Sequence, residues 1–167
     1  MPIDTSSLAS NNSSYLDIIS DPNNLYNAFL LAKKGSSWKA SVQQYEINLL
    51  KNITDLSESL KNRTYRQKPF TEFVMCERGK IRPIRAQCIE DRVVQRCLCD
   101  NILLPTLRPY LIYDNGASLK GRGIDFSKKR LKVHLEKFLR HHDMGYILLI
   151  DFSKFFDNIP HDLLYKA

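Results

Sequence analysis

The stretch Gly145-Tyr-Ile-Leu-Leu-Ile-Asp151-Phe-Ser-Lys-Phe-Phe-Asp-Asn-Ile159 decides how the rest of the chain is interpreted. Its aliphatic run, residues 146–150, follows a glycine and predicts a buried β-strand. The run ends on Asp151. A carboxylate at the tip of a buried strand has to be hydrogen-bonded, paired or metal-bound, because burial of an isolated charge is costly. Asn158-Ile159-Pro160 then predicts the start of a helix.

Asp151 has two interpretations. A strand-end Asp often caps the helix that follows, which is a purely structural role. The whole string, however, places Phe156 five positions after the Asp and a helix beyond it, and it resembles the first catalytic motif of reverse transcriptases, most closely those of bacterial retroelements and group II introns. The resemblance implies that Asp151 and the main-chain carbonyl of Phe152 bind catalytic Mg²⁺ (or Mn²⁺). It also implies that Phe156 lies under the sugar of the incoming nucleotide.

The composition is that of a soluble globular protein, with 167 residues, 43% hydrophobic and 26% charged. No apolar run approaches the roughly 18 residues of a membrane helix. Residues 1–14 are rich in Ser and Asn, lack a basic and apolar signal pattern, and are expected to be disordered. We therefore expect a cytoplasmic protein with reduced cysteines. A zinc site using Cys97, Cys99 and a distant His is disfavoured, because the spacing fits no common ligand pattern.

Positive charge is concentrated in the middle of the chain. Residues 61–140 hold 19 Lys/Arg and 8 Asp/Glu, a net charge of +11, whereas the remaining residues hold 6 and 10. Such a block indicates a polyanionic partner, most often a nucleic acid. The alternative is a basic face that only contacts solvent.

The sequence of the first half of the chain predicts helices to which we assign no catalytic or binding role. Asp21-Pro22 begins a helix that ends near Gly35. A second helical stretch is expected over residues 37–62, because its apolar residues recur every three or four positions: Tyr45, Leu49, Ile53, Leu56 and Leu60.

Residues 70–86 predict a β-hairpin with a turn at Glu77-Arg78-Gly79-Lys80. Its tip and return strand carry Arg78, Lys80, Arg82 and Arg85. One interpretation is an edge strand protected from aggregation by positive charge. The other is a mobile hairpin whose cations close on a phosphate chain, since Arg and Lys both bind phosphate oxygens.

The second half predicts two more helices and a glycine-rich loop. A helix runs from Cys88 to about Leu104, with Arg92 on its surface, before Pro105 and Pro109 break the pattern. The loop 114–123 combines three glycines with cations, which suits a sugar–phosphate strand. A third helix, about 125–142, is expected to point five apolar side chains inward: Phe126, Leu131, Leu135, Phe138 and Leu139.

The order of these parts strengthens the resemblance. A basic hairpin, the string Asp91-Arg92-Val-Val-Gln95, the loop with Ser118, Lys120 and Arg122, and the Asp151 motif follow one another as in the fingers and early palm of a reverse transcriptase. The implied fold is α+β: fingers of helices and a β-hairpin over residues 15–144, and an incomplete palm over 145–167. The likeness implies that Lys80 and Arg82 bind the nucleotide triphosphate, with Arg78 as a substitute if the hairpin register differs. It also implies that Arg92, Ser118, Lys120 and Arg122 bind nucleic acid, although Leu119 stands where the family often has an aromatic.

The resemblance implies an RNA-directed DNA polymerase, with an RNA template, a DNA primer and dNTPs as partners. That family also needs a Tyr/Phe-x-Asp-Asp motif, which does not occur in this sequence. We therefore expect the N-terminal part of a longer enzyme, inactive by itself and prone to self-association through its apolar strand. The alternative function is an RNA-binding module, maturase-like, for intron or retroelement RNA.

Overall fold

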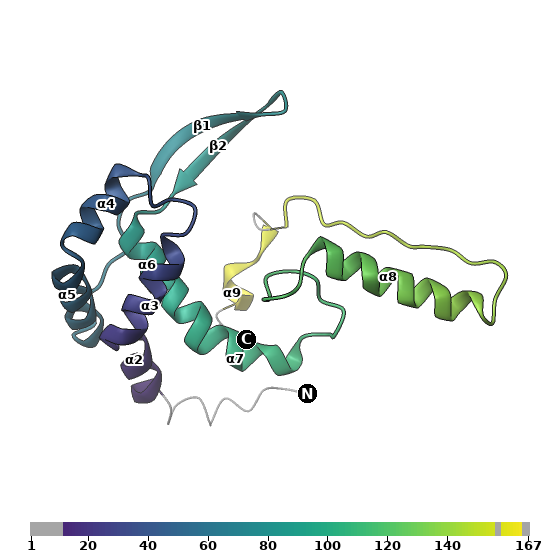
Figure 1. The fold of residues 1–167 in the computed structure, drawn as a ribbon, viewed down its shortest axis with the longest axis horizontal. Coiled ribbons are helices and arrows are strands. Elements are labelled where there is room, and N and C mark those ends of the chain that lie inside the picture. Colours follow the sequence, from purple (N-terminus) through teal and green to yellow (C-terminus); the bar gives the residue numbers. More distant parts are fainter. Residues whose placement is uncertain (1–11, 156–157, 165–167) are drawn as a thin grey trace. The chain divides into compact units, whose positions relative to one another are not determined.

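The computed structural model describes residues 12–155 and 158–164, which form helices and one two-stranded antiparallel hairpin, an α+β arrangement (Figure 1). The chain divides into two compact units, with the boundary between Pro109 and Tyr110. Within the described part of the chain, no helix is both long and apolar enough to cross a membrane. The expectations for Phe156 and for residues 1–11 fall outside the described residues.

The first unit is built on a helical core. Helices α2 (Asn12–Ser20), α3 (Pro22–Ala32), α5 (Leu49–Lys61) and α6 (Ile89–Leu98) pack together. The predicted start of α3 is confirmed, since the Asp21 carboxylate accepts hydrogen bonds from two N–H groups of the first turn, at 2.7 and 3.1 Å. The most deeply buried apolar side chains of the core are Leu25, Phe29, Val42, Val93 and Cys97.

The second helical stretch is interrupted. Helix α4 (Ala40–Ile47) ends at Asn48, whose backbone leaves the helical region, and α5 begins at Leu49. The Asn52 side chain donates to the carbonyl of Tyr45 at 2.9 Å, which satisfies a carbonyl that the end of α4 would leave unpaired. The predicted apolar stripe is still the buried side of both helices, except that Leu49 is only partly buried.

Helix α6 continues further than the prolines suggested. It runs through a π-helical turn, η1 (Cys99–Leu103), into α7 (Leu104–Leu107) and a short 3₁₀ turn, η2 (Arg108–Tyr110). Pro105 lies in the first turn of α7, where its missing N–H is tolerated. The predicted helix from Cys88 is thus confirmed and extends three residues beyond Leu104.

The predicted hairpin is confirmed. Strand β1 (Thr71–Glu77) pairs with β2 (Lys80–Ala86) across a two-residue turn at Arg78 and Gly79. Both strands are largely exposed, and the hairpin projects from the helices of its unit (Figure 1). An isolated two-stranded hairpin is only marginally stable, so its attachment to α6 has to hold it in place.

In the second unit, which contains α8, two predictions made from the sequence are wrong. Its main helix, α8 (Ile124–Leu139), has no buried residue, so the prediction that its apolar side chains point into a core is wrong. The chain then turns back along α8 at Gly145, where a Cβ would lie 2.6 Å from the ring of Phe138, and a short helix, α9 (His161–Leu164), follows later.

The buried strand predicted over residues 146–150 is also wrong. The segment forms no strand, and its five side chains are 68–101% exposed. A strand needs a partner to pair its backbone N–H and C=O groups. Among the described residues, the only paired strands are those of the hairpin.

Candidate nucleic-acid interface

The hairpin places two of the predicted phosphate-binding cations on one face. Lys80 lies opposite Glu77 and Arg82 lies opposite Met75 in the strand register. Residues two apart on a strand share a face, so the side chains of Lys80 and Arg82 emerge together. Arg82 forms an ion pair with Glu77 at 3.4 Å, and both side chains are more than half exposed. Such an exposed pair contributes little, so a phosphate can compete for Arg82.

Arg78 occupies the tip of the hairpin in a costly backbone conformation. Arg78 and Gly79 have φ angles of 51° and 77°, as a two-residue turn of the I′ type requires. Asn-Gly is the usual sequence for this turn, since residues other than Gly, Asn and Asp resist positive φ. The sequence therefore keeps an arginine where the turn itself disfavours it.

In the glycine-rich loop, only some of the side chains predicted to bind nucleic acid are exposed to solvent. Ser118 and Lys120 are exposed. The Arg122 guanidinium instead stacks on the Phe126 ring, 3.9 Å from its centroid, and donates to the Tyr113 carbonyl at 2.7 Å. The role of Arg122 in nucleic-acid binding stays a prediction, and the structure gives this side chain a part in holding the loop against α8.

A second cation, Arg130, also contacts this loop. The Arg130 guanidinium lies 4.9 Å from the centroid of the Tyr113 ring and donates to the Asp114 carboxylate. His134 contacts the other oxygen of Asp114 at 2.5 Å. The hydrogen bond from Arg130, and then that from His134, lower the pKa of Asp114 from its usual value. Asp114 therefore stays ionised and fixes the loop to two successive turns of α8.

Asp151 and Phe152 are exposed, and the segment they lie in forms neither helix nor strand. Two Mg²⁺ ions need several carboxylate or carbonyl oxygens. Among the described residues, no group of three His, Cys, Asp or Glu side chains lies close enough to hold a metal ion. Asp151 supplies a single carboxylate, so the described residues do not by themselves form a two-metal centre.

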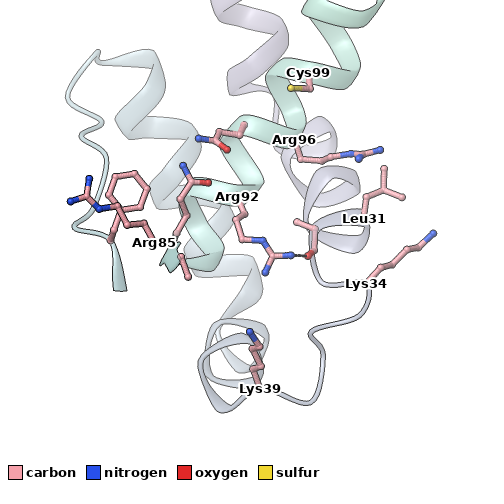
Figure 2. Close-up of a pocket in the computed structure, with 12 residues that line it drawn as sticks. Leu31, Lys34, Lys39, Arg85, Arg92, Arg96 and Cys99 are labelled. Atoms are coloured by element: carbon pink, nitrogen blue, oxygen red, sulfur yellow. Dashed lines mark hydrogen bonds between the residues drawn. The ribbon is translucent and has the colours of Figure 1, made fainter. Parts of the chain in front are cut away.

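A basic groove that the sequence did not reveal lies at the base of the hairpin. This basal groove, about 780 Å³ in volume, is bounded by the end of α3 and the loop after it, by residues 85–87, and by one side of α6 (Figure 2). Among the described residues that line it, none is acidic, and five are cations: Lys34, Lys39, Arg85, Arg92 and Arg96. Lys34 and Lys39 were missed because they lie in the loop between α3 and α4, which carried no motif.

Arg92 has a structural role in this groove. Its guanidinium donates to the carbonyl of Ala32 and to the Oγ of Ser36, the latter at 3.2 Å. Figure 2 shows its side chain reaching across the groove from α6. The predicted binding residue therefore orders the loop that carries Lys34 and Lys39, and its contact with nucleic acid stays a prediction.

Comparison with known proteins does not identify a family for this chain. No protein-family model matches the chain, and no curated protein sequence matches it significantly.

Proposed function

We propose that the chain is the fingers and the beginning of the palm of an RNA-directed DNA polymerase, which transfers nucleotides from dNTPs onto a primer 3′-hydroxyl. The order of motifs that ends in Asp151 and Phe156 carries the proposal. The shared exposed face of Lys80 and Arg82, with Arg78 at the tip, supports it. Cations placed there neutralise the β- and γ-phosphates of a dNTP as negative charge moves onto the leaving group.

The test is addition of one dNTP to a primer on an RNA template, using the product of the whole reading frame. Asp151→Asn should lower kcat/KM by about 100-fold or more, because a lost metal ligand removes several kcal/mol of transition-state stabilisation. Asp55→Asn, an exposed change on α5, is the matched control. Residues 1–167 alone should show no extension. Equal activity of the Asp151→Asn variant and the wild type would contradict the proposal.

The second candidate is an RNA-binding module without polymerase activity. The five cations of the basal groove favour it, since a groove without acidic lining attracts a polyanion whether or not catalysis occurs. Tight RNA binding by a wild-type protein that adds no nucleotide would favour this function over the polymerase.

A further inference from the structure

We propose that the basal groove binds the sugar–phosphate backbone of a single-stranded nucleic acid, at a site separate from the hairpin tip. The site consists of Lys34, Lys39, Arg85 and Arg96 as phosphate contacts, with the Phe70 ring and the amides of Gln87 and Gln95 also in the lining. It does not rest on the polymerase proposal, because it follows from the groove's own charge and lining.

The cations of the groove are available to an incoming phosphate. Lys34 and Lys39 have exposed side chains. Arg85 pairs with Glu72 at 2.8 Å and Arg96 pairs with Asp100 at 2.6 Å, both at the surface. Exposed pairs of this kind contribute little to stability, so a phosphate can replace the carboxylate at little cost.

The other lining residues favour nucleic acid over an acidic peptide. Phe70 lines the groove and is 44% exposed. Trp38 does not line the groove, but it lies in the loop next to Lys39, is 73% exposed and has the Lys39 ammonium 5.6 Å from its ring centroid. Exposed rings beside cations provide stacking platforms for unpaired bases. The amides of Gln87 and Gln95 can hydrogen-bond base edges or ribose hydroxyls.

The loop that carries the lysines is ordered before any ligand arrives. Ser36 is buried, and its Oγ accepts a hydrogen bond from Arg92. Gly35 supplies the positive φ of 74° that turns the chain between Lys34 and Ser36. Figure 2 shows the Lys39 side chain directed toward Arg92. Such preorganisation lowers the entropic cost of binding.

The first test is fluorescence anisotropy of labelled 12-nucleotide RNA and DNA oligonucleotides with the chain, without Mg²⁺ or dNTPs. Lys34→Ala/Lys39→Ala should weaken binding about 25-fold at 0.1 M salt and reduce the slope of log K against log salt by about 1.4, as expected for two lost phosphate contacts. Lys51→Ala/Lys61→Ala removes the same charge from the exposed side of α5 and should change affinity much less. Equal losses in the two double variants would overturn the proposal.

The second test locates the ligand through the cysteines. Cys99 lines the groove and is exposed, whereas Cys76 is exposed on the hairpin and outside the groove. Bound oligonucleotide should slow alkylation of Cys99 and leave Cys76 unchanged, as measured by mass spectrometry of the peptides. Stronger protection by RNA than by DNA supports ribose recognition, and equal protection supports backbone recognition. Unprotected Cys99, or better protection by a poly-glutamate peptide than by either oligonucleotide, would overturn the proposal.

Discussion

The hydroxyl of Tyr65 donates a hydrogen bond of 2.5 Å to the carboxylate of Asp91, which is only 1% exposed. The same carboxylate accepts the backbone N–H of Lys68 at 3.1 Å, and the Lys68 ammonium pairs with Glu90 at 2.5 Å. These contacts join the segment before the hairpin to the first turn of α6. The hairpin is therefore held at its base by a buried carboxylate, which compensates for its own marginal stability.

Tyr65→Phe should lower the free energy of unfolding by about 1–3 kcal/mol, because it leaves the buried Asp91 carboxylate short of a donor. Tyr45→Phe should be neutral or stabilising, because the buried Tyr45 hydroxyl has no hydrogen-bond partner among the described residues. Urea unfolding of both variants measures the contrast. Tyr26→Phe, at an exposed site, is the control. Equal destabilisation by the two buried substitutions would contradict the assignment of the hydrogen bond.

Stability should fall at alkaline pH. Burial raises the pKa of Tyr45 and of Tyr65 above the ordinary value of 10.0, and the hydrogen bond to Asp91 raises that of Tyr65 further. Above pH 10 the unfolded chain loses these protons while the folded chain keeps them. The stability present below pH 10 is therefore lost as pH rises, by up to about 1.4 kcal/mol per pH unit for the buried Tyr45 and by less for the partly exposed Tyr65.

The pH dependence is measured from urea midpoints between pH 9 and 11.5. Tyr45→Phe/Tyr65→Phe should flatten the decline but not abolish it, since the pKa of Lys68 is also raised, chiefly by its hydrogen bond with Glu90. An unchanged slope in the double variant would show that other groups control alkaline unfolding.

Local signals in the sequence predicted local structure well. The Asp21 cap and the Arg78-Gly79 turn depend on neighbouring residues, so the sequence was sufficient for both. The hydrogen bond between Tyr65 and Asp91 links residues 26 positions apart in the sequence. Lys34 and Arg96 line the same groove only because α3 packs on α6. Such contacts leave no local pattern. The strand predicted over residues 146–150 does not form. An apolar run shows a tendency to form a strand, but it does not show whether a partner strand is there to pair with it.

Arg78→Asn should stabilise the hairpin by about 0.5–1 kcal/mol, because Asn tolerates positive φ better than Arg does. The same change should weaken dNTP or oligonucleotide binding if Arg78 contacts phosphate. Hydrogen exchange of the β1 and β2 amides measures the first effect, and anisotropy measures the second. Lys51→Asn, an exposed change on α5 that also removes one positive charge, is the control. A more stable hairpin with unchanged binding would show that Arg78 only forms the turn and does not contact phosphate.

Arg122→Lys should loosen the loop 114–123 although the charge is kept. The planar guanidinium stacks on Phe126 and donates to the Tyr113 carbonyl, and an ammonium reproduces neither geometry well. We expect a loss of about 0.5–2 kcal/mol in local stability. Faster amide exchange in the loop, with unchanged exchange in α5, is the expected result. If Arg122→Lys instead leaves the loop unchanged and weakens oligonucleotide binding, the side chain acts on the ligand.

The exposed apolar segment 146–150 should make the chain associate with itself. Its five side chains form an uninterrupted apolar run, and its backbone N–H and C=O groups are not paired in a sheet. Two such segments can pair with each other and cover their side chains, as exposed edge strands do. Ile147→Lys/Leu149→Lys should therefore lower the mass measured by light scattering. Ile47→Lys/Leu50→Lys alters two equally exposed side chains of the helical unit and should not. A wild-type chain that stays monomeric at high concentration would rule out this mode of association, and equal effects of the two double variants would show that added charge alone is responsible.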